Sequence, residues 1–374
     1  MIFPDYKNNI VNVSATISKW LGNDNDIPQI KSLQDELEKN PQNVIFMVVD
    51  GLGKNILEKH LAKDSFLRKN IRQTLTTVFP STTTCATTTL ASATYPAEHG
   101  WLSWAMNFPE NKTVELFRDT DYYTGKPVEK DFAFDNLPFK LFFSKPSKAI
   151  EVHACATEKI RIHKTANDHH AFTGIKGMFK EIKKICRGYN QKFVYVYTTQ
   201  PDATMHSFGI GHKKVSKIVH EINDRLEKFM KKHPETLVVL TADHGHIDLA
   251  GFIHIHEDKE ITDCLASPFS GEARAAFFHI KKNMHDKFKR AFEKYAADFD
   301  LYETKDLIKK GVFGDFKDNG YEKFLGDYIA AGKDTNKAFV FAPGKEIYNG
   351  NAIIGHHTGM TADEMQVPLV IISS

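Results

Sequence analysis

Residues 237–248 read LVVLTADHGHID, and this stretch gives the first indication of both the fold class and a functional site. Its apolar first half, Leu237 to Leu240, is typical of a buried strand. Asp243 and His244 follow that strand, and groups beyond the carboxyl ends of strands line the ligand crevice of open α/β sheets. Zinc accepts both side chains as ligands. A solvated loop aspartate beside a capping histidine is an equally good interpretation of this stretch alone, so its meaning depends on partners elsewhere.

The same pattern of an apolar strand followed by an aspartate occurs near residue 50. Residues 44–49 form a continuous apolar run, and Asp50 and two glycines come directly after it. Residues 54–63 then show helical spacing of apolar side chains. This order of strand, turn and helix predicts an α/β fold.

Two further strand ends carry residues of the same type. The strand-like segment 193–197 precedes Asp202 and His206, whose spacing of one helical turn lets both side chains face one point. The pair His356 and His357 precedes the last apolar strand of the sequence. Together the strand ends, with one histidine of the His356/His357 pair, supply three carboxylates and three imidazoles, which is what two three-ligand metal sites with open positions require.

The segment 74–100 has the most unusual composition of the chain, because it is rich in threonine. Pro80 ends the secondary-structure element that precedes it. Ser81 or Thr82 is then a candidate N-cap for a helix that continues to about Ala93. Threonine is a poor helix former, so we expect either burial of these small side chains or a hydroxyl presented at the positive end of the helix. A pair of threonine-rich strands is the alternative.

Two long segments interrupt the strand-and-helix order, at about residues 101–177 and about residues 250–340. The first is aromatic and irregular and is interpreted as a lid, and the second as another cap beside the sheet. Histidines 163, 169 and 170 lie in the first segment without suitably spaced carboxylates and are expected at the surface. We predict one catalytic domain over residues 1–374 that carries both insertions.

Composition excludes several other classes of protein. The chain has 374 residues with 49 basic and 47 acidic side chains, a net charge of +2, so no global field draws it to duplex nucleic acid or to a membrane. No secretory signal and no apolar run long enough for a membrane span is found. Its cysteines are far apart and form no C-x-x-C pair, which excludes a zinc ribbon and favours a reduced, cytoplasmic protein.

Five motifs, taken together, resemble one known group of enzymes. In chain order they are VVDGLG, FPSTTTCATTTLASATYPAEHG, PDATMHSFG, TADHGH and GHHTGMTADEMQVPLV. The chain resembles the alkaline phosphatase superfamily and, within it, the nucleotide pyrophosphatase/phosphodiesterase (type I phosphodiesterase) family. The resemblance implies an α/β fold with a mostly parallel central sheet flanked by helices on both faces, and a hydrolase that acts on a small phosphorylated substrate such as a nucleotide.

The resemblance also implies roles for individual residues. It places one zinc ion on Asp202, His206 and His357, and a second on Asp50, Asp243 and His244; manganese or iron could replace zinc. It makes Thr83 the nucleophile and a ligand of the second ion, with Thr82 as the fallback. His246 is expected to be no more than a neighbour of these ligands.

One position departs from the family pattern and limits the prediction of the substrate. Nucleotide pyrophosphatases carry an asparagine that holds a phosphoryl oxygen where this chain has Trp104, with Asn107 slightly later. Both residues are therefore candidate substrate contacts. A phosphonoacetate-hydrolase-like enzyme that cleaves a C–P bond, a phosphomonoesterase, and a non-catalytic metal-binding module of the same fold remain as alternatives. A sulfatase is disfavoured, because Cys85 lacks the C-x-P-x-R context of the modified nucleophile.

Overall fold

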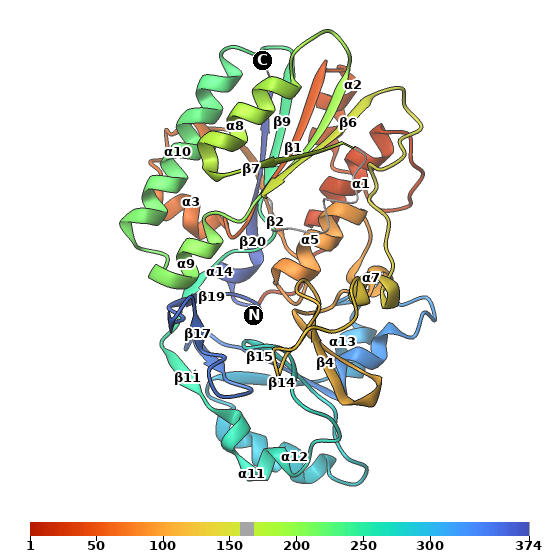
Figure 1. Cartoon of the computed structure of the whole chain (residues 1–374), viewed down its shortest axis with the longest axis vertical. Helices are drawn as coiled ribbons and strands as arrows, with labels where there is room; N and C mark the ends of the chain where they lie inside the picture. Colours follow the sequence, from red (N-terminus) through yellow and green to blue (C-terminus); the bar gives the residue numbers. More distant parts are fainter. Residues whose placement is uncertain (158–167, 374) are drawn as a thin grey trace.

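A computed structural model describes residues 1–157 and 168–373 of the chain and shows two seven-stranded sheets (Figure 1). The strands of the main sheet are, in spatial order, β2 (Ile71–Thr76), β20 (Gln366–Ile372), β9 (Thr236–Thr241), β1 (Asn43–Val49), β8 (Lys192–Thr198), β6 (Glu151–Thr157) and β7 (His169–Phe172). Every residue of β1, β8 and β9 is buried, as expected for central strands that are covered on both faces.

The main sheet is mixed. Strands β9, β1, β8, β6 and β7 pair in parallel, whereas β20 is antiparallel to both of its neighbours. The chain enters β20 from the carboxyl edge of the parallel strands, because the segment around His357 lies at that edge, and β20 must therefore run in the opposite direction. The structure thus confirms the α/β class, while the expected mostly parallel sheet has an antiparallel part.

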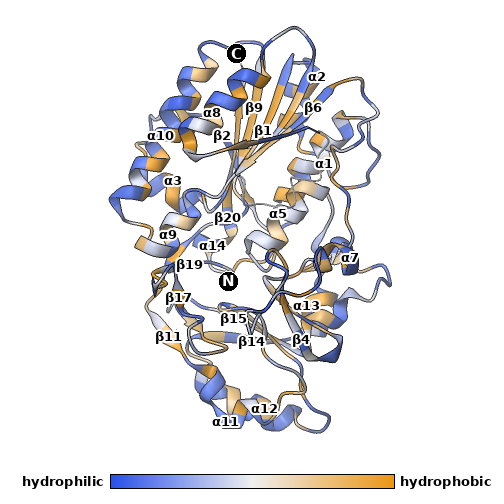
Figure 2. Cartoon of the chain, viewed as in Figure 1, coloured by the Kyte–Doolittle hydropathy of each residue, from blue (hydrophilic) through white to orange (hydrophobic). Residues whose placement is uncertain are grey.

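Helices lie on both sides of the main sheet (Figure 1). Helices α3 (Lys54–His60), α8 (Gly174–Ile185) and α10 (Lys213–Met230) lie on one side, and α1 (Ile10–Trp20) and α5 (Thr83–Ser92) on the other. Figure 2 shows the sheet as largely hydrophobic and α10 as hydrophilic on its outer face. No helix in the described part of the chain combines the length and apolar composition that crossing a membrane requires.

Helix α5 accommodates its threonines by burying them. Thr87 and Thr88 donate their hydroxyls to the carbonyls of Thr83 and Thr84, at 2.6 and 2.7 Å, so each hydroxyl is satisfied inside the helix. On the side of α1, the hydroxyl of Ser14 donates to the carbonyl of Leu90 at 2.8 Å. Small side chains therefore let the two helices pack closely.

The second sheet is antiparallel and is built from both predicted insertions. Its strands are, in spatial order, β14 (Phe299–Glu303), β15 (Tyr328–Gly332), β13 (Ala275–Phe278), β12 (Ser270–Glu272), β3 (Ala105–Phe108), β4 (Lys112–Glu115) and β5 (Thr120–Asp121). A smaller hydrophobic core lies between this sheet and helices α11 (Lys259–Thr262) and α12 (His285–Phe292). Strands β6 and β7, although they belong to the segment 101–177, extend the main sheet.

Shorter elements connect these parts. The remaining helices are α2 (Lys31–Glu38), α4 (Phe66–Lys69), α6 (Pro96–His99), α7 (Phe132–Asn136), α9 (Asp202–Phe208), α13 (Thr304–Lys309) and α14 (Ala362–Met365). The remaining strands are β10 (Ile247–Asp248), β11 (Gly251–Ile253), β16 (Lys337–Phe339), β17 (Ile347–Tyr348), β18 (Asn351–Ala352) and β19 (Gly355–His356).

A fully buried ion pair connects the second sheet to α14. Arg274, between β12 and β13, donates through Nε to Glu364 Oε1 at 2.7 Å and through Nη2 to Oε2 at 3.0 Å. The same guanidinium donates to the carbonyls of Lys337 and Lys333, at 2.7 and 3.1 Å. The backbone carbonyl of Glu364 accepts from the N–H of Gly245, at 2.9 Å, so the pair also supports the loop after β9.

Candidate metal centre

The predicted ligands meet at the carboxyl edge of the main sheet. Asp50 follows β1, Asp202 begins α9 after β8, and Asp243 follows β9. Because β8, β1 and β9 are adjacent and parallel, their ends lie side by side. The structure thus brings together the residues that the motifs indicated, and all of these ligand candidates except His206 are buried: Asp50, Asp202, Asp243, His244 and His357.

Each carboxylate has one oxygen without a hydrogen-bond partner in residues 1–157 and 168–373, namely Asp50 Oδ1, Asp202 Oδ1 and Asp243 Oδ2. The Nε2 atom of His244 lies 3.4 Å from both Asp50 Oδ1 and Asp243 Oδ2. On the other side, Asp202 Oδ1 lies 3.4 Å from His206 Nε2 and 3.7 Å from His357 Nε2. An unpaired buried carboxylate oxygen is costly unless something else balances it.

Backbone carbonyls decide which ring nitrogen of each histidine carries the proton. Nδ1 of His206 faces the carbonyl of Gly355 at 2.8 Å, Nδ1 of His244 that of Gly245 at 2.9 Å, and Nδ1 of His357 that of Ser81 at 2.9 Å. A carbonyl can only accept, so Nδ1 donates and Nε2 presents its lone pair to the unpaired carboxylate oxygens. Lone pairs that converge in this way fit a divalent cation, and the orientation of each imidazole by a carbonyl is the usual arrangement around a metal.

The pKa shifts of the clustered residues are those expected where buried carboxylates lie close together beside neutral imidazoles. Burial and the neighbouring Asp243 and Asp202 raise the pKa of Asp50 well above its ordinary value. Burial would also raise the pKa of Asp202, but the imidazoles of His206 and His246 outweigh it and lower the pKa. Burial lowers the pKa of His357 well below its usual value, which keeps the ring neutral and able to act as a ligand.

Two threonines at the start of α5 have different partners. Thr83, the first residue of the helix, places its Oγ1 3.2 Å from His244 Nε2. Thr82 instead donates to Glu272 Oε1 at 2.6 Å. No side chain of the described residues caps this end of α5, so its first N–H groups can receive an anion. The geometry therefore places Thr83, and not Thr82, beside the ligand cluster.

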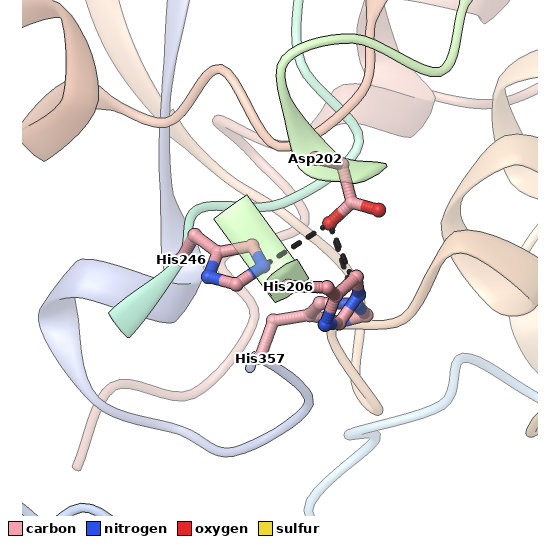
Figure 3. Close-up of side chains that lie close together, drawn as sticks. All are labelled: Asp202, His206, His246 and His357. Carbon is pink, nitrogen blue, oxygen red and sulfur yellow. Dashed lines mark ion pairs between the residues drawn. The ribbon is translucent and has the colours of Figure 1, made fainter. Parts of the chain in front are cut away.

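His246 belongs to the cluster, although the sequence motifs assigned it no role. Its Nε2 lies 3.2 Å from Asp202 Oδ1, and its ligand atom lies within 4.8 Å of those of Asp202, His206 and His357 (Figure 3). Asp202 is also grouped in the same way with Asp50 and His244, so the two candidate sites adjoin. The signal in the sequence was the H-G-H spacing, but spacing alone does not show where the second ring points.

A cavity of about 470 Å³ opens beside Thr83. Trp104 lines it, and the backbone N–H of Trp104 donates to Glu272 Oε1 at 2.9 Å. Arg118 also lines it and lies over the Trp104 ring, 5.2 Å from its centroid. The structure does not bring Asn107 to this cavity, because its amide nitrogen donates to Ser267 and Pro268, at 3.1 and 2.8 Å.

Charged residues of the cavity wall were not predicted from the sequence. Arg118 Nη1 and Lys345 Nζ lie 3.2 and 3.1 Å from the two carboxylate oxygens of Glu115. Two cations share one carboxylate there, which leaves a net positive charge. Burial raises the pKa of Glu272 to about 7, so this carboxyl adds little negative charge below neutral pH.

A second group of ligand-type residues lies at the β6–β7 edge. His153 Nδ1 lies 2.6 Å from Asp168 Oδ2, and His170 Nε2 lies 3.1 Å from Asp168 Oδ1. Asp168 can accept a hydrogen bond from each ring, so these two contacts do not require an ion. Position 163 of the predicted surface histidines lies outside the described residues.

An α/β sheet whose carboxyl edge carries clustered carboxylates and imidazoles beside a helix-initiating threonine has the features of a metal-dependent hydrolase. The sequence profile of the type I phosphodiesterase / nucleotide pyrophosphatase family matches residues 44–320, which is most of the chain. The chain therefore belongs to this family and is a hydrolase of that type. No curated protein sequence matches it.

Solved structures of similar fold include two kinds of enzyme. Murine ectonucleotide pyrophosphatase / phosphodiesterase 5, as an inactive threonine-to-alanine variant in complex with AMP, has a TM-score of 0.63 at 17% identity, with 88% of this chain and 87% of that chain covered. The human protein has a TM-score of 0.60 at 16% identity, with 89% and 88% covered. Phosphonoacetate hydrolase from Sinorhizobium meliloti 1021 in complex with phosphonoformate has a TM-score of 0.64 at 14% identity, with 88% and 90% covered. At these identities the likeness shows the fold.

Proposed function

We propose that the protein is a phosphodiesterase or nucleotide pyrophosphatase that uses Thr83 as its nucleophile and two zinc ions, within one catalytic domain that carries both insertions. One observation carries this proposal: the hydroxyl of Thr83 lies at the start of α5, 3.2 Å from a His244 nitrogen that faces unpaired carboxylate oxygens. A nucleophilic hydroxyl, ligand groups and a helix N-terminus therefore converge at one place.

The donor set supports two adjacent ions. Asp202, His206 and His357 would hold the first, and Asp50, Asp243 and His244, with Thr83, the second. Bound zinc would neutralise phosphoryl oxygens and lower the pKa of the Thr83 hydroxyl, and manganese or iron would supply the same positive charge.

The side chains of the protein then define the course of the reaction. Thr83 gives up its hydroxyl proton to water, its Oγ1 attacks phosphorus, the P–O bond on the opposite side breaks, and the leaving alcohol or nucleotide takes up a proton from water. The uncapped N–H groups at the start of α5 donate to the phosphoryl oxygens as charge develops. Water then cleaves the threonyl-phosphoryl bond and restores the Thr83 hydroxyl.

The cavity supports a substrate that carries both an apolar ring and a further anionic group. Trp104 and Tyr122 offer aromatic surface, and Arg118 and Lys345 offer positive charge. A volume of about 470 Å³ is within the range of small-molecule sites. The complex of the murine protein with AMP makes a nucleotide ester the first substrate to test.

A phosphonoacetate-hydrolase-like activity is the second candidate, because Arg118 and Lys345 could equally hold the carboxylate of a phosphonocarboxylic acid. Bis-p-nitrophenyl phosphate, p-nitrophenyl phosphate and phosphonoacetate should be assayed side by side. We expect the diester to turn over fastest. Dominant release of phosphate from phosphonoacetate would overturn the diesterase assignment in favour of C–P cleavage.

Elemental analysis of the purified protein tests the metal centre directly, with about two zinc ions per chain expected from the two-metal arrangement. A folded, active protein without metal would refute it. We also propose a reducing, cytoplasmic location, because Cys85, Cys155, Cys186 and Cys264 are all buried and unpaired.

A further inference from the structure

His246 is the imidazole nearest to the unpaired oxygen of Asp202. Its Nε2 lies 3.2 Å from Asp202 Oδ1, compared with 3.4 Å for His206 and 3.7 Å for His357 (Figure 3). The ring is completely buried. A residue with no role in the metal centre has no evident reason to place a buried nitrogen at that point.

The orientation of the His246 ring follows the same rule as that of the predicted ligands. Its Nδ1 faces the carbonyl of Ile247 at 3.3 Å, which directs the lone pair of Nε2 towards Asp202. Neither His246 Nε2 nor Asp202 Oδ1 has a hydrogen-bond partner within the described residues, although the two atoms are close enough for one. His246 Nε2 and Asp202 Oδ1 therefore face each other at 3.2 Å, which is close to the separation of two ligand atoms on one tetrahedral zinc ion.

The three rings around Asp202 are arranged nearly symmetrically. Their centroids are 4.8 Å apart for His206 and His246, 5.2 Å for His206 and His357, and 5.4 Å for His246 and His357. Three imidazoles bound tetrahedrally at zinc–nitrogen distances near 2.0 Å place their centroids about 5 Å apart and their ligand atoms about 3.4 Å apart. The observed spacing needs little adjustment to reach that geometry.

Two other histidine groups lack this arrangement. His356 is next to His357 in sequence, but its Nδ1 accepts from the His357 N–H at 2.9 Å, and it is not part of the ligand cluster. In the group of His153 and His170, the carboxylate of Asp168 can accept from both rings. Proximity to other histidines is therefore not enough to produce the convergence seen at His246.

We propose that His246 is a fourth protein ligand of the ion held by Asp202, His206 and His357. This inference rests on the metal centre proposed above. Three imidazoles and one carboxylate would complete a tetrahedral zinc site, whereas the second site, formed by Asp50, Asp243 and His244, would take its fourth ligand from the reacting hydroxyl of Thr83. His246 would then help to hold the first ion with side chains that take no part in the reaction, and Thr83 would be the only reacting group among the proposed protein ligands.

The number of imidazoles bound to zinc distinguishes a ligand from a residue that only orients Asp202. His244→Ala first disables the second site, so that only the first site can bind zinc. A chelator then removes all bound metal from this variant, and one equivalent of zinc is added back. X-ray absorption at the zinc edge should then give three imidazole nitrogens. His246→Gln in this background should give two, with at least a 100-fold weaker zinc affinity, and the matched control His356→Gln should still give three.

Each outcome has a definite meaning. If zinc binds only two imidazole nitrogens while His246 is still present, or if His246→Gln does not change the number of bound imidazoles, His246 is not a ligand. Either result leaves the proposed two-ion centre unaffected. Absence of bound zinc in the unmodified protein overturns the proposed function as well. If His246→Gln fails to fold by circular dichroism, the count in the His244→Ala protein alone still decides the question.

Discussion

Arg274→Met tests whether the buried pair with Glu364 holds the second sheet onto the metal-binding edge. The substitution leaves the Glu364 carboxylate fully buried without its cation, and removing one partner of such a pair costs about 3–5 kcal/mol. Burial raises the pKa of Glu364, and it is the Arg274 guanidinium that brings this pKa below its ordinary value. Without the guanidinium, the carboxyl must take up a proton or remain charged in an apolar site.

The size of the effect follows from the chain length. Unfolding entropy is about 2.1 cal/mol/K per residue, so for 374 residues a loss of 3–5 kcal/mol lowers Tm by about 4–6 °C. Urea unfolding and thermal melts should be measured in chelator, so that metal binding does not contribute. The Glu364 carboxylate also accepts from the backbone N–H of Gly359, at 2.8 Å, and His357 lies two residues before Gly359. His357 should therefore shift in the variant, and weaker zinc retention should accompany the lower stability.

A double variant separates charge from packing. Because the main cost is an uncompensated carboxylate, Arg274→Met/Glu364→Gln should be more stable than Arg274→Met by at least about 1 kcal/mol. A loss below about 1 kcal/mol for Arg274→Met, or no recovery in the double variant, would show that the ion pair does not hold the two parts together.

Three further predictions concern the site. Thr83→Ala should keep the fold, and Asp50, Asp243 and His244 should still hold the second ion, but turnover should fall by more than about 1,000-fold because the nucleophile is lost; unchanged turnover would move that role to Thr82 or exclude it. Chelation should lower Tm by about 3 °C for each ion whose free concentration was 100 times its Kd, because binding at that concentration stabilises the folded state by about 2.7 kcal/mol. Calorimetry with and without chelator measures this shift in Tm, and equal Tm values would contradict a bound ion. Burial raises the pKa of Glu272 to about 7, so the folded protein keeps a proton that the unfolded chain releases near pH 4.5. The free energy of unfolding of the metal-free protein should therefore fall as the pH rises from 4.5 to 7, and change little above pH 7. Glu272→Gln should remove that loss, which is at most about 3 kcal/mol, and parallel pH profiles of the two proteins would refute the shift.

The clustering of the candidate ligands could be predicted because each of these residues has a local signal. An apolar run followed by a ligand-type residue marks a strand end, and adjacent parallel strands bring such ends together. Asp50, Asp202 and Asp243 met for this reason. The helix from Thr83 could be predicted because Pro80 interrupts the chain just before it.

The second sheet could not be predicted, because its strands are short and its pairings join distant parts of the chain. Gly271 pairs with Ala105 although more than a hundred residues separate them, and no local pattern encodes that contact. The role of His246 depends on a backbone carbonyl that orients its ring, and spacing does not reveal it. Arg118 and Lys345 resemble ordinary surface charges until the fold places both against Glu115.

The position of β20 has a consequence for how the protein is made. This strand fills the place between β2 and β9, yet the ribosome delivers residues 366–372 after every other strand of the sheet. Until β20 has been made, one edge of the apolar strand β9 has no pairing partner, and His357 is itself among the last residues to be synthesised before β20. The nascent chain therefore carries an open, aggregation-prone strand edge from the synthesis of β9 until residue 372 has left the ribosome, and only then can the sheet close.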